Sequence, residues 1–522
     1  MRVVLPSEMA RIDRMAVEEE GIPSLELMER AGEGVARAAR DMLSCGAGRR
    51  VAVVCGKGNN GGDGLVAARR LSASFEASVC VVGATRPDCL SPDSRANFER
   101  LPGTPVVVQW LSDPGEVAEF ARAAPTFDLI IDCLFGTGFK GPASGVFAGV
   151  IDAVNASGRP VLAVDIPSGV EGDTGAVAGP AVVAEKTVTF AAPKVGLVQF
   201  PGAGHVGEMD VVDIGIPDRL VENVPDSRIF VTTEEEADGL LPHRPPDAHK
   251  GTCGNVLVIG GSAGMSGAVS LCAQAALRSG AGLVRAAVPE GLCDIMETKL
   301  TEVITVPVAQ GRRRSLSLEA ADVLMECGRN ASAVALGPGM STEPEARDLA
   351  RRLVAGIEAP LVLDADGLNA MAGSTDALTK RRHPLVLTPH PGEMARLLGT
   401  DTEAVQRDRI GAARRAAADW EAVVVLKGAG TVTAGPDGDV YVNPTGNSGM
   451  ATAGMGDVLT GCVASMLAQG LGVLEAAVAA AWFHGYAGDL AARMEGRVGM
   501  TAGDVARHLP LALRRVPEER WS

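Results

Sequence analysis

The sequence lacks the features that mark secreted, zinc-binding or membrane-spanning proteins. Its ten cysteines include no Cys-x-x-Cys pair, which argues against a zinc site and a disulfide framework and favours a reducing compartment. Residues 1–20 contain no apolar core of a signal peptide, and no apolar run approaches the roughly 20 residues of a membrane span. We therefore expect a cytoplasmic protein without a membrane partner.

Positive charge, and lysine above all, is also scarce. Only eight of the 48 basic residues are lysine, and 64 acidic residues give a formal net charge of −16. This balance argues against nucleic acid and anionic membranes as partners. A phosphate-bearing ligand would need backbone amides and a few well-placed cations. Four lysines, Lys57, Lys140, Lys250 and Lys427, lie in or beside glycine-rich turns.

The chain is long enough for two α/β domains. It has 522 residues, 46% of them hydrophobic, which fits two domains of about 200 to 300 residues each. Apolar runs alternate with helical patterns in the first half, which predicts a parallel sheet covered by helices. The expected strands are 51–54, 79–82, 129–132, 161–165 and 187–190, and the expected helices include 65–71 and 146–155.

The alternation stops between residues 217 and 246 and then starts again. Segments 232–236 and 242–246 have the composition of a domain boundary, so we place the junction near 217–230 and the domains at 1–220 and 228–522. The expected strands of the second half are 256–259, 283–288, 333–336, 361–364, 385–388, 423–426 and 431–434. Long helices are expected at 402–420 and 473–494.

Polar residues follow several expected strands of the first half. The glycine-rich segment 59–64 follows the first strand, Asp132 and Asp165 each end a later one, and segments 136–141 and 167–169 come next. Ligands of open parallel sheets bind beyond the carboxyl ends of the strands. A single such aspartate could simply cap the next helix, but this many polar segments together favour one ligand site.

These segments resemble the NAD(P)H-hydrate epimerase family over roughly residues 1–215. The resemblance implies a Rossmann-like three-layer fold, the hydrated cofactors NADHX and NADPHX as substrates, and a bound potassium ion. It implies Asp165 as the acid/base residue with Lys140 assisting, and Asn60, Asp132 and Ser168 as potassium ligands. The ligand-binding residues would be Asn59, Asn60, Gly61, Gly62, Asp63, Gly136, Thr137, Gly138, Phe139, Lys140, Gly141, Pro142 and Asp165.

The second half contains a comparable set of turns after its expected strands. Residues 260–268, 337–339, 388–393 and 427–431 follow apolar runs, and segment 454–457 opens an apolar helix at 458–467. A small-residue turn at a helix N-terminus can bind phosphate, and Asp457 could act there as a base. Alternatively, Asp457 is only a favourable acidic residue in the first turn of a helix.

This set resembles the ADP/ATP-dependent NAD(P)H-hydrate dehydratase family over about residues 228–515. The resemblance implies a ribokinase-like fold, ADP as phosphate donor, magnesium to neutralise the phosphates, and Asp457 as base. The hydrate would contact Ala268, Gly339, His390 and Asp457. The adenine nucleotide would contact Lys427, Gly428, Ala429, Gly430, Thr431 and Gly456. The chain departs from the family pattern at Ser448, Ala453 and Met455.

The sequence thus predicts a bifunctional repair enzyme, and the resemblance suggests a homo-oligomer. The first half would interconvert R and S hydrates, and the second would dehydrate the S form at the expense of ADP, giving AMP and phosphate. The alternative is a ribokinase-like small-molecule kinase fused to a non-catalytic nucleotide-binding module. His390 argues against the kinase, because sugar kinases of this fold typically have Asn there, although Glu393 is kept.

Overall fold

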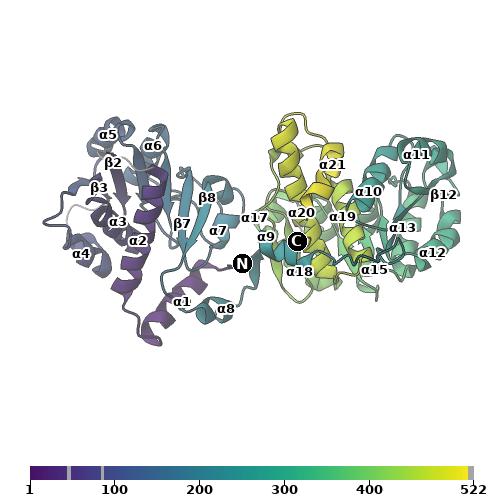
Figure 1. The fold of residues 1–522 in the computed structure, drawn as a ribbon, viewed down its shortest axis with the longest axis horizontal. Helices are drawn as coiled ribbons and strands as arrows, with labels where there is room; N and C mark the ends of the chain where they lie inside the picture. The colour runs from purple at the N-terminus through teal and green to yellow at the C-terminus, as the bar shows by residue number, and fades with distance from the viewer. Residues whose placement is uncertain (44–48, 84–86, 515–522) are drawn as a thin grey trace. The chain divides into compact units, whose positions relative to one another are not determined.

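The computed structural model describes residues 1–43, 49–83 and 87–514. It divides into two compact units (Figure 1). The N-terminal unit is Arg2–Ile229, and the C-terminal unit is Phe230–Ser522 together with Met1.

The N-terminal unit is built on a parallel sheet with the strand order β4-β3-β2-β5-β6-β7-β8. Its strands are β2 (Arg50–Cys55), β3 (Glu76–Val82), β4 (Val107–Leu111), β5 (Leu129–Cys133), β6 (Val161–Val164), β7 (Lys186–Phe190) and β8 (Glu208–Val212), and the short strand β1 (Arg2–Val3) precedes them. The five strands predicted in this half are confirmed. The edge strands β4 and β8 escaped prediction because they are half-exposed and lack a continuous apolar run.

Helices cover both faces of this sheet. The helices are α1 (Pro6–Glu18), α2 (Ser24–Leu43), α3 (Asn59–Leu71), α4 (Pro92–Phe98), α5 (Pro114–Ala123), α6 (Val146–Ala156), α7 (Val195–Val198) and α8 (Asp218–Asn223). Val51 and Val53 of β2 pack with α1, α2 and α3, whereas Ala52 and Val54 pack with α5 and α6. Because alternate strand residues enter opposite cores, the unit has three layers.

The C-terminal unit is built on a mixed sheet. Its strand order is β9-β18-β17-β16-β15-β14-β13-β10-β11-β12, parallel from β16 to β12 and antiparallel from β16 to β18. The strands are β9 (Ile229–Val231), β10 (Asn255–Ile259), β11 (Leu283–Pro289), β12 (Ile304–Val308), β13 (Ala333–Leu336), β14 (Leu361–Leu363), β15 (Leu385–Leu387), β16 (Val423–Leu426), β17 (Val432–Ala434) and β18 (Val440–Val442).

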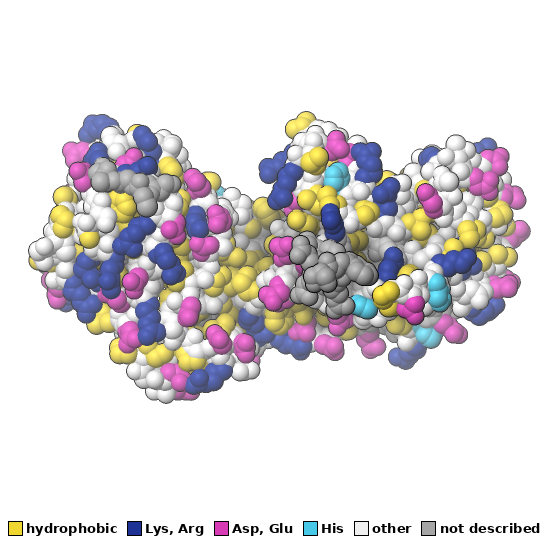
Figure 2. Space-filling model, in the orientation of Figure 1, with side chains coloured by type: hydrophobic (Ala, Val, Ile, Leu, Met, Phe, Trp, Pro, Cys, Tyr) yellow, Lys and Arg dark blue, Asp and Glu magenta, His cyan; other side chains and the backbone are white. Residues whose placement is uncertain are grey.

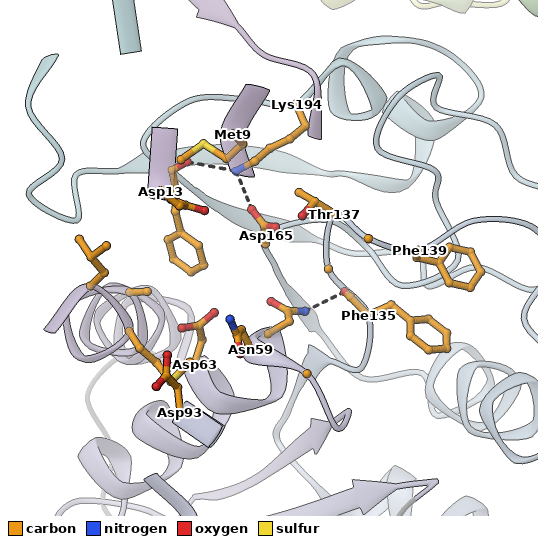
Figure 3. Close-up of a pocket in the computed structure, with 18 of the residues that line it drawn as sticks. Met9, Asp13, Asn59, Asp63, Asp93, Phe135, Thr137, Phe139, Asp165 and Lys194 are labelled. Atoms are coloured by element: carbon orange, nitrogen blue, oxygen red, sulfur yellow. Dashed lines mark hydrogen bonds and ion pairs between the residues drawn. The ribbon is translucent and has the colours of Figure 1, made fainter. Parts of the chain in front are cut away.

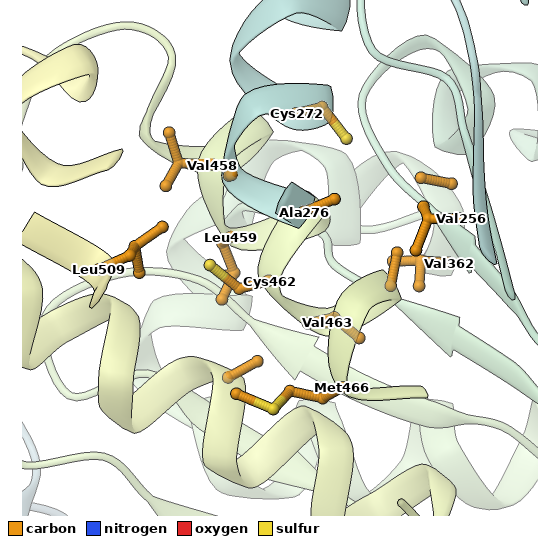
Figure 4. Packing of buried hydrophobic residues seen from close by; sticks show 14 of the residues in the cluster. Val256, Cys272, Ala276, Val362, Val458, Leu459, Cys462, Val463, Met466 and Leu509 are labelled. Atoms are coloured by element: carbon orange, nitrogen blue, oxygen red, sulfur yellow. The ribbon is translucent and has the colours of Figure 1, made fainter. Parts of the chain in front are cut away.

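A large apolar cluster lies within the C-terminal unit. It includes Cys272 and Ala276 of α10 (Ser266–Arg278) and Val463 and Met466 of α19 (Met455–Ala468) (Figure 4). The helices of this unit are α9 (Glu234–Leu240), α10 (Ser266–Arg278), α11 (Cys293–Lys299), α12 (Ala321–Arg329), α13 (Pro344–Gly356), α14 (Asp366–Met371), α15 (Asp376–Thr379), α16 (Pro391–Leu398), α17 (Thr402–Arg407), α18 (Arg409–Trp420), α19 (Met455–Ala468), α20 (Val473–Glu495) and α21 (Ala502–Ala512). Burial in this cluster fixes the N-terminal end of α19, which carries Asp457.

One prediction about a helix was wrong. The single helix expected at 402–420 is two helices, because Asp408 has φ −141° and its carboxylate accepts a hydrogen bond from the amide of Gly411 at 2.8 Å, which caps α18. The segment 232–236, which the sequence placed in the boundary region, contains the start of α9. Thr233 and Glu236 form a capping box at the start of α9.

Among the described residues, no helix is long and apolar enough to cross a membrane. On the face drawn in Figure 2, acidic, basic and apolar side chains are interspersed over both units.

Candidate active sites

The glycine-rich segment 59–64 forms the first turns of α3 and not a separate turn, as the sequence had suggested. Close backbone packing explains its glycines. A Cβ at position 61 would lie 2.0 Å from the carbonyl oxygen of Gly56, and one at position 56 would lie 1.9 Å from that of Leu134. Asn60 Nδ2 also donates to the carbonyl oxygen of Phe135 at 2.7 Å. The N-terminus of α3 is thus locked against the loop after β5.

A cavity of about 770 Å³ opens beside this N-terminus (Figure 3). Of the predicted ligand residues, the cavity is lined by Asn59, Asn60, Asp63, Gly136, Thr137, Gly138, Phe139, Lys140 and Asp165. Gly61 and Gly62 instead face protein, since a Cβ at position 62 would lie 2.6 Å from Met28 Sδ. Gly141 donates its amide to Glu171 Oε1, and Pro142 packs beside Gly179. These four residues do not line the cavity.

Asp165 is held in the cavity by a lysine that the sequence analysis did not select. Asp165 follows β6 with φ 64°, and its Oδ1 lies 2.6 Å from Lys194 Nζ. Lys194 is 1% exposed, and its Nζ also donates to Thr189 Oγ1 at 3.0 Å and to the carbonyl oxygen of Phe190 at 3.1 Å. The signals that could have identified Lys194 are the scarcity of lysine and its place just after β7.

Further carboxyl groups share the cavity with this pair. Burial raises the pKa of Asp13 to about 6, with Lys194 opposing the shift and Asp165 adding to it. Burial raises the pKa of Asp63 well above its usual value, and Asp165 and Asp13 add to the shift. The cavity therefore combines the buried ammonium of Lys194 with four carboxyl groups, those of Asp13, Asp63, Asp93 and Asp165, and Asp13 and Asp63 bind protons more readily than usual.

The three predicted potassium ligands lie around the loop after β5. Asp132 is 1% exposed and accepts hydrogen bonds from Ser168 Oγ at 2.7 Å and from the Ser168 amide at 2.8 Å. Phe135 joins them to Asn60, because its amide donates to Ser168 Oγ and its carbonyl accepts from Asn60. Burial raises the pKa of Asp132 to about 6 despite the bonds from Ser168. Asn60 Oδ1 is buried and has no hydrogen-bond partner in the described part of the chain.

Lys140, the predicted assistant of Asp165, lies at the rim of the cavity. Its side chain is 75% exposed, and its Nζ lies 3.1 Å from Asp173 Oδ2. The buried cation next to Asp165 is Lys194.

In the C-terminal unit a partly buried lysine again meets an aspartate at a strand end. Lys427 Nζ lies 2.6 Å from Asp364 Oδ1, just after β14, and 3.7 Å from Glu393 Oε2. Asp364 Oδ2 accepts from Thr460 Oγ1 of α19 at 2.8 Å. Burial alone would lower the pKa of Lys427, but the carboxylates of Asp364 and Glu393 outweigh it and raise that pKa. Sequence reasoning missed Asp364 and Thr460.

Asp457 lies in the first turn of α19 beside this network. Burial raises the pKa of Asp457 to about 7, with Asp364 adding to the shift and Lys427 opposing it. A Cβ on the preceding Gly456 would lie 3.1 Å from Lys427 Nζ. Predicted residues from two distant segments, Lys427 and 456–457, are thus brought together at a helix N-terminus.

The departures from the family pattern at 453 and 455 do not disturb the backbone of this turn. Gly454 is the N-cap and takes the left-handed conformation, with φ 93°. The side chain of Met455 is buried in the apolar core. The bulk of Met455 therefore points into the protein.

The predicted hydrate contacts Ala268 and Gly339 are neighbours, while His390 also has a structural role. A Cβ at position 339 would lie 3.2 Å from the Cβ of Ala268. His390 is the N-cap of α16, and its Nδ1 accepts from the amides of Gly392 and Glu393. Burial and then Lys427 lower the pKa of His390. The ring is half-exposed, so capping leaves an edge open to a ligand.

The predicted nucleotide-binding segment 427–431 is supported from behind by a buried arginine. Arg409 Nη2 donates to the carbonyl oxygens of Leu426 and Lys427, and Thr431 Oγ1 donates to that of Gly428 at 2.9 Å. Gly428 has φ 141° and Gly430 has φ 61°. The segment is therefore a preformed turn that begins at Lys427.

The two units define a class of protein, an enzyme with two separate α/β active sites for nucleotide-like ligands. Residues 24–196 match the family model described as YjeF-related protein N-terminus, and residues 256–511 match that of NAD(P)H-hydrate dehydratase.

Relatives extend these matches over the whole chain. The bifunctional NAD(P)H-hydrate repair enzyme of Moorella thermoacetica is 47% identical over 99% of this chain and 98% of its own, and that of Escherichia coli is 34% identical over 95% and 91%. The crystal structure of the ADP/ATP-dependent NAD(P)H-hydrate dehydratase from Bacillus subtilis, crystallised with ATP and Mg²⁺, is 31% identical, with a TM-score of 0.48, and covers 54% of this chain and 97% of its own.

This chain belongs to the family of bifunctional NAD(P)H-hydrate repair enzymes. The predicted Rossmann-like and ribokinase-like folds, and the predicted epimerase and dehydratase functions, are confirmed. The kinase alternative is not favoured by these matches.

Proposed function

We propose that the cavity of the N-terminal unit is the epimerase site and that Asp165 moves a proton there. The observation that supports this role is the bond between Asp165 Oδ1 and Lys194 Nζ, 2.6 Å long, inside a cavity lined by the predicted ligand residues. The hydrate carries a hydroxyl on a ring carbon bound to nitrogen. Removing the hydroxyl proton allows the ring to open, which erases the stereocentre.

Aromatic side chains supply the apolar part of this site. Phe135 and Phe139 stack with ring centroids 4.5 Å apart, and Phe147 lies 5.2 Å from Phe135. All three line the cavity. They offer a flat apolar surface to the nicotinamide-derived ring, while the N-terminus of α3 suits the phosphates of the cofactor.

The residues around Asn60 fit a potassium ion. Its Oδ1 is a buried oxygen without a hydrogen-bond partner, and Asp132 adds a buried carboxylate beside Ser168. Oxygen donors of this kind suit a hard cation. Asn60, Asp132 and Ser168 would hold the ion, which would supply positive charge next to the ligand-binding loop. An Asn60→Ala variant should lose any potassium dependence of epimerisation.

The C-terminal unit is proposed to phosphorylate and then dehydrate the S hydrate. Asp457 would take the hydroxyl proton as the oxygen attacks the terminal phosphorus of the nucleotide. A pKa of about 7 places Asp457 where a general base works best at neutral pH. The resulting phosphate is a better leaving group than hydroxide, so the ring nitrogen can expel it. Loss of a proton from the neighbouring carbon then restores the dihydronicotinamide.

ADP is the proposed phosphate donor, and magnesium the proposed metal of this half. The carboxylates of Asp364, Glu393 and Asp457 outnumber the single Lys427 ammonium, so the site carries excess negative charge. Among the described residues no three His, Cys, Asp or Glu form a metal cage. Magnesium would be held mainly by nucleotide phosphates and water. Glu393 is the candidate protein ligand.

The test is the recovery of NADPH absorbance from a mixed R and S hydrate preparation with ADP, ATP or neither. Complete recovery with ADP is expected for the wild type. On the same time scale, Asp165→Asn should recover only the S fraction, and Asp457→Asn should recover none. Full recovery by Asp165→Asn would contradict its role, and equal rates with ADP and ATP would contradict the proposed donor preference.

A further inference from the structure

Helix α1 brings a carboxyl group into the epimerase cavity that neither the sequence analysis nor the proposed function uses. Asp13 lines the cavity, and its side chain lies on the same side as Asp165 and Lys194 (Figure 3). In the described part of the chain, no hydrogen bond reaches the Asp13 carboxyl group. Asp13 is partly exposed and lines the cavity, so its carboxyl group is free to contact a ligand bound there.

Lys194 is not available to be the missing partner. An ammonium group has three protons to donate. Lys194 Nζ gives them to Asp165 Oδ1, Thr189 Oγ1 and the carbonyl oxygen of Phe190. Lys194 therefore balances charge and orients Asp165, but it has no proton left to offer to Asp13 or to a substrate.

We infer that Asp13 is the proton donor that complements Asp165 in the epimerase cavity. This inference rests on the proposed function, in which Asp165 accepts the proton of the substrate hydroxyl. Opening the ring needs both groups, because one proton leaves the oxygen while another must reach the ring nitrogen.

Opening the ring moves two protons and one electron pair. Asp165 takes the hydroxyl proton, the carbon–oxygen bond becomes a carbonyl, and the carbon–nitrogen bond breaks with its electron pair going to nitrogen. Asp13 gives its proton to that nitrogen. Rotation about the adjacent carbon–carbon bond presents the other face of the carbonyl. Ring closure then returns one proton to Asp13 and the other to the hydroxyl oxygen, so both residues regain their starting forms.

The charges that face Asp13 are consistent with a group that gives and regains a proton. Asp63 of α3, Asp165 after β6 and Lys194 before α7 all interact with it electrostatically. Burial raises the pKa of Asp13 to about 6, so both of its forms are populated near neutral pH. Burial also raises the pKa of Asp63 well above its usual value, and Asp165 and Asp13 add to that shift.

The experiment compares Asp13→Asn, Asp165→Asn and Glu18→Gln in the full chain. Glu18 is an exposed carboxylate on the same helix and serves as the charge control. We would measure the rate of R and S interconversion against pH, the Kd of the hydrate, and thermal unfolding. Asp13→Asn is expected to slow interconversion on the order of 10²- to 10⁴-fold with little change in Kd, and to remove the fall in rate at high pH.

The outcomes separate the inference from the function on which it rests. If Asp13→Asn keeps the wild-type rate while Asp165→Asn is inactive, the role of Asp13 is wrong and that of Asp165 stands. If both variants keep the wild-type rate, the proposed role of Asp165 fails as well. If Asp13→Asn loses rate only in proportion to a weaker Kd or a lower unfolding temperature, Asp13 is structural and the inference is overturned.

Discussion

The two units bury the same charge pair and use it differently. In each, a lysine Nζ lies 2.6 Å from the Oδ1 of an aspartate that follows a parallel strand, Lys194 with Asp165 and Lys427 with Asp364. Burying such charges is costly, so each pair must be satisfied by its partner. The two pairs differ in the number of hydrogen bonds that the lysine donates.

We call Lys194 a closed cation, because its ammonium group has no proton left for a ligand. We call Lys427 an open cation, because its ammonium group can still bind a ligand. Side-chain and backbone oxygens take all three protons of Lys194. The described residues give Lys427 a single hydrogen bond, to Asp364, and its Nζ lies close to Gly456 at the start of α19. Proton transfer needs a fixed carboxylate, while phosphoryl transfer needs a cation that can still reach phosphate. The same pair therefore supports two chemistries.

The largest effect is expected at the site of the C-terminal unit, which contains the open cation Lys427. Asp457→Asn should lower the rate of dehydration on the order of 10²- to 10⁴-fold, because the hydroxyl would lose its general base. Epimerisation should be unchanged, since Asp457 and Asp165 belong to different units. Separate assays on purified S and R hydrates measure both rates in one preparation. A comparable loss of both activities would mean that the variant acts through folding.

Substitution of Lys194 and Lys427 should show that only the open cation binds a ligand. Lys194→Met and Lys427→Met each leave a buried carboxylate unpaired, which should cost about 3–5 kcal/mol of unfolding free energy. Only Lys427→Met should also weaken nucleotide binding. Denaturant unfolding and nucleotide titration provide the two measurements. Equal nucleotide affinity in Lys427→Met and wild type would show that Lys427 is closed as well.

The pH dependence of the two activities should differ in a definite direction. A base works when ionised, and burial raises the pKa of Asp457 to about 7. Dehydration should therefore rise about tenfold between pH 6 and pH 8. Initial rates with purified S hydrate at constant ionic strength test this. Asp457→Asn should have a flat residual profile, and a wild-type rate that falls over this range would contradict the assignment.

The stability of the C-terminal unit should show the opposite trend. The folded pKa of Asp457 is raised from 3.8 to about 7, so its protonated form stabilises the fold at low pH. That contribution is lost as pH rises through about 7. Asp457→Asn should therefore be more stable than wild type at pH 8 and similar to it below pH 4. Unfolding free energies at the two pH values check the sign.

The sequence predicted the buried strands, which depend on neighbouring residues. It missed the contacts between side chains that lie far apart in the chain. Strands such as β5 and β13 were predicted because burial on both faces gives a continuous apolar run. The edge strand β12 escaped because its exposed positions break that run. Asp132 and Asp165 were found because strand ends of a parallel sheet share one edge.

The electrostatic partners of the sites could not be predicted in this way. The pairing of Asp364 with Thr460 spans 96 residues, and that of Asp364 with Lys427 spans 63. Nothing local in the sequence distinguishes Asp13 from the other charged residues of its helix. These partners emerge only when the helices pack on the sheet.

The smallest expected effect separates the two lysines of the epimerase cavity. Lys140→Ala should reduce epimerisation less than about tenfold, because an exposed ion pair such as that with Asp173 contributes little. Lys194→Met should reduce the rate far more, since it frees Asp165 from its fixed position. Steady-state rates for the two variants, with Asp173→Ala as the matched control for Lys140, provide the comparison. A loss on the order of 10²-fold in Lys140→Ala alone would return Lys140 to the role of assistant to Asp165 that the sequence predicted. Lys140 would then be the open cation of the N-terminal unit. Each site would combine an aspartate held in place by hydrogen bonds with a lysine that can still bind a ligand.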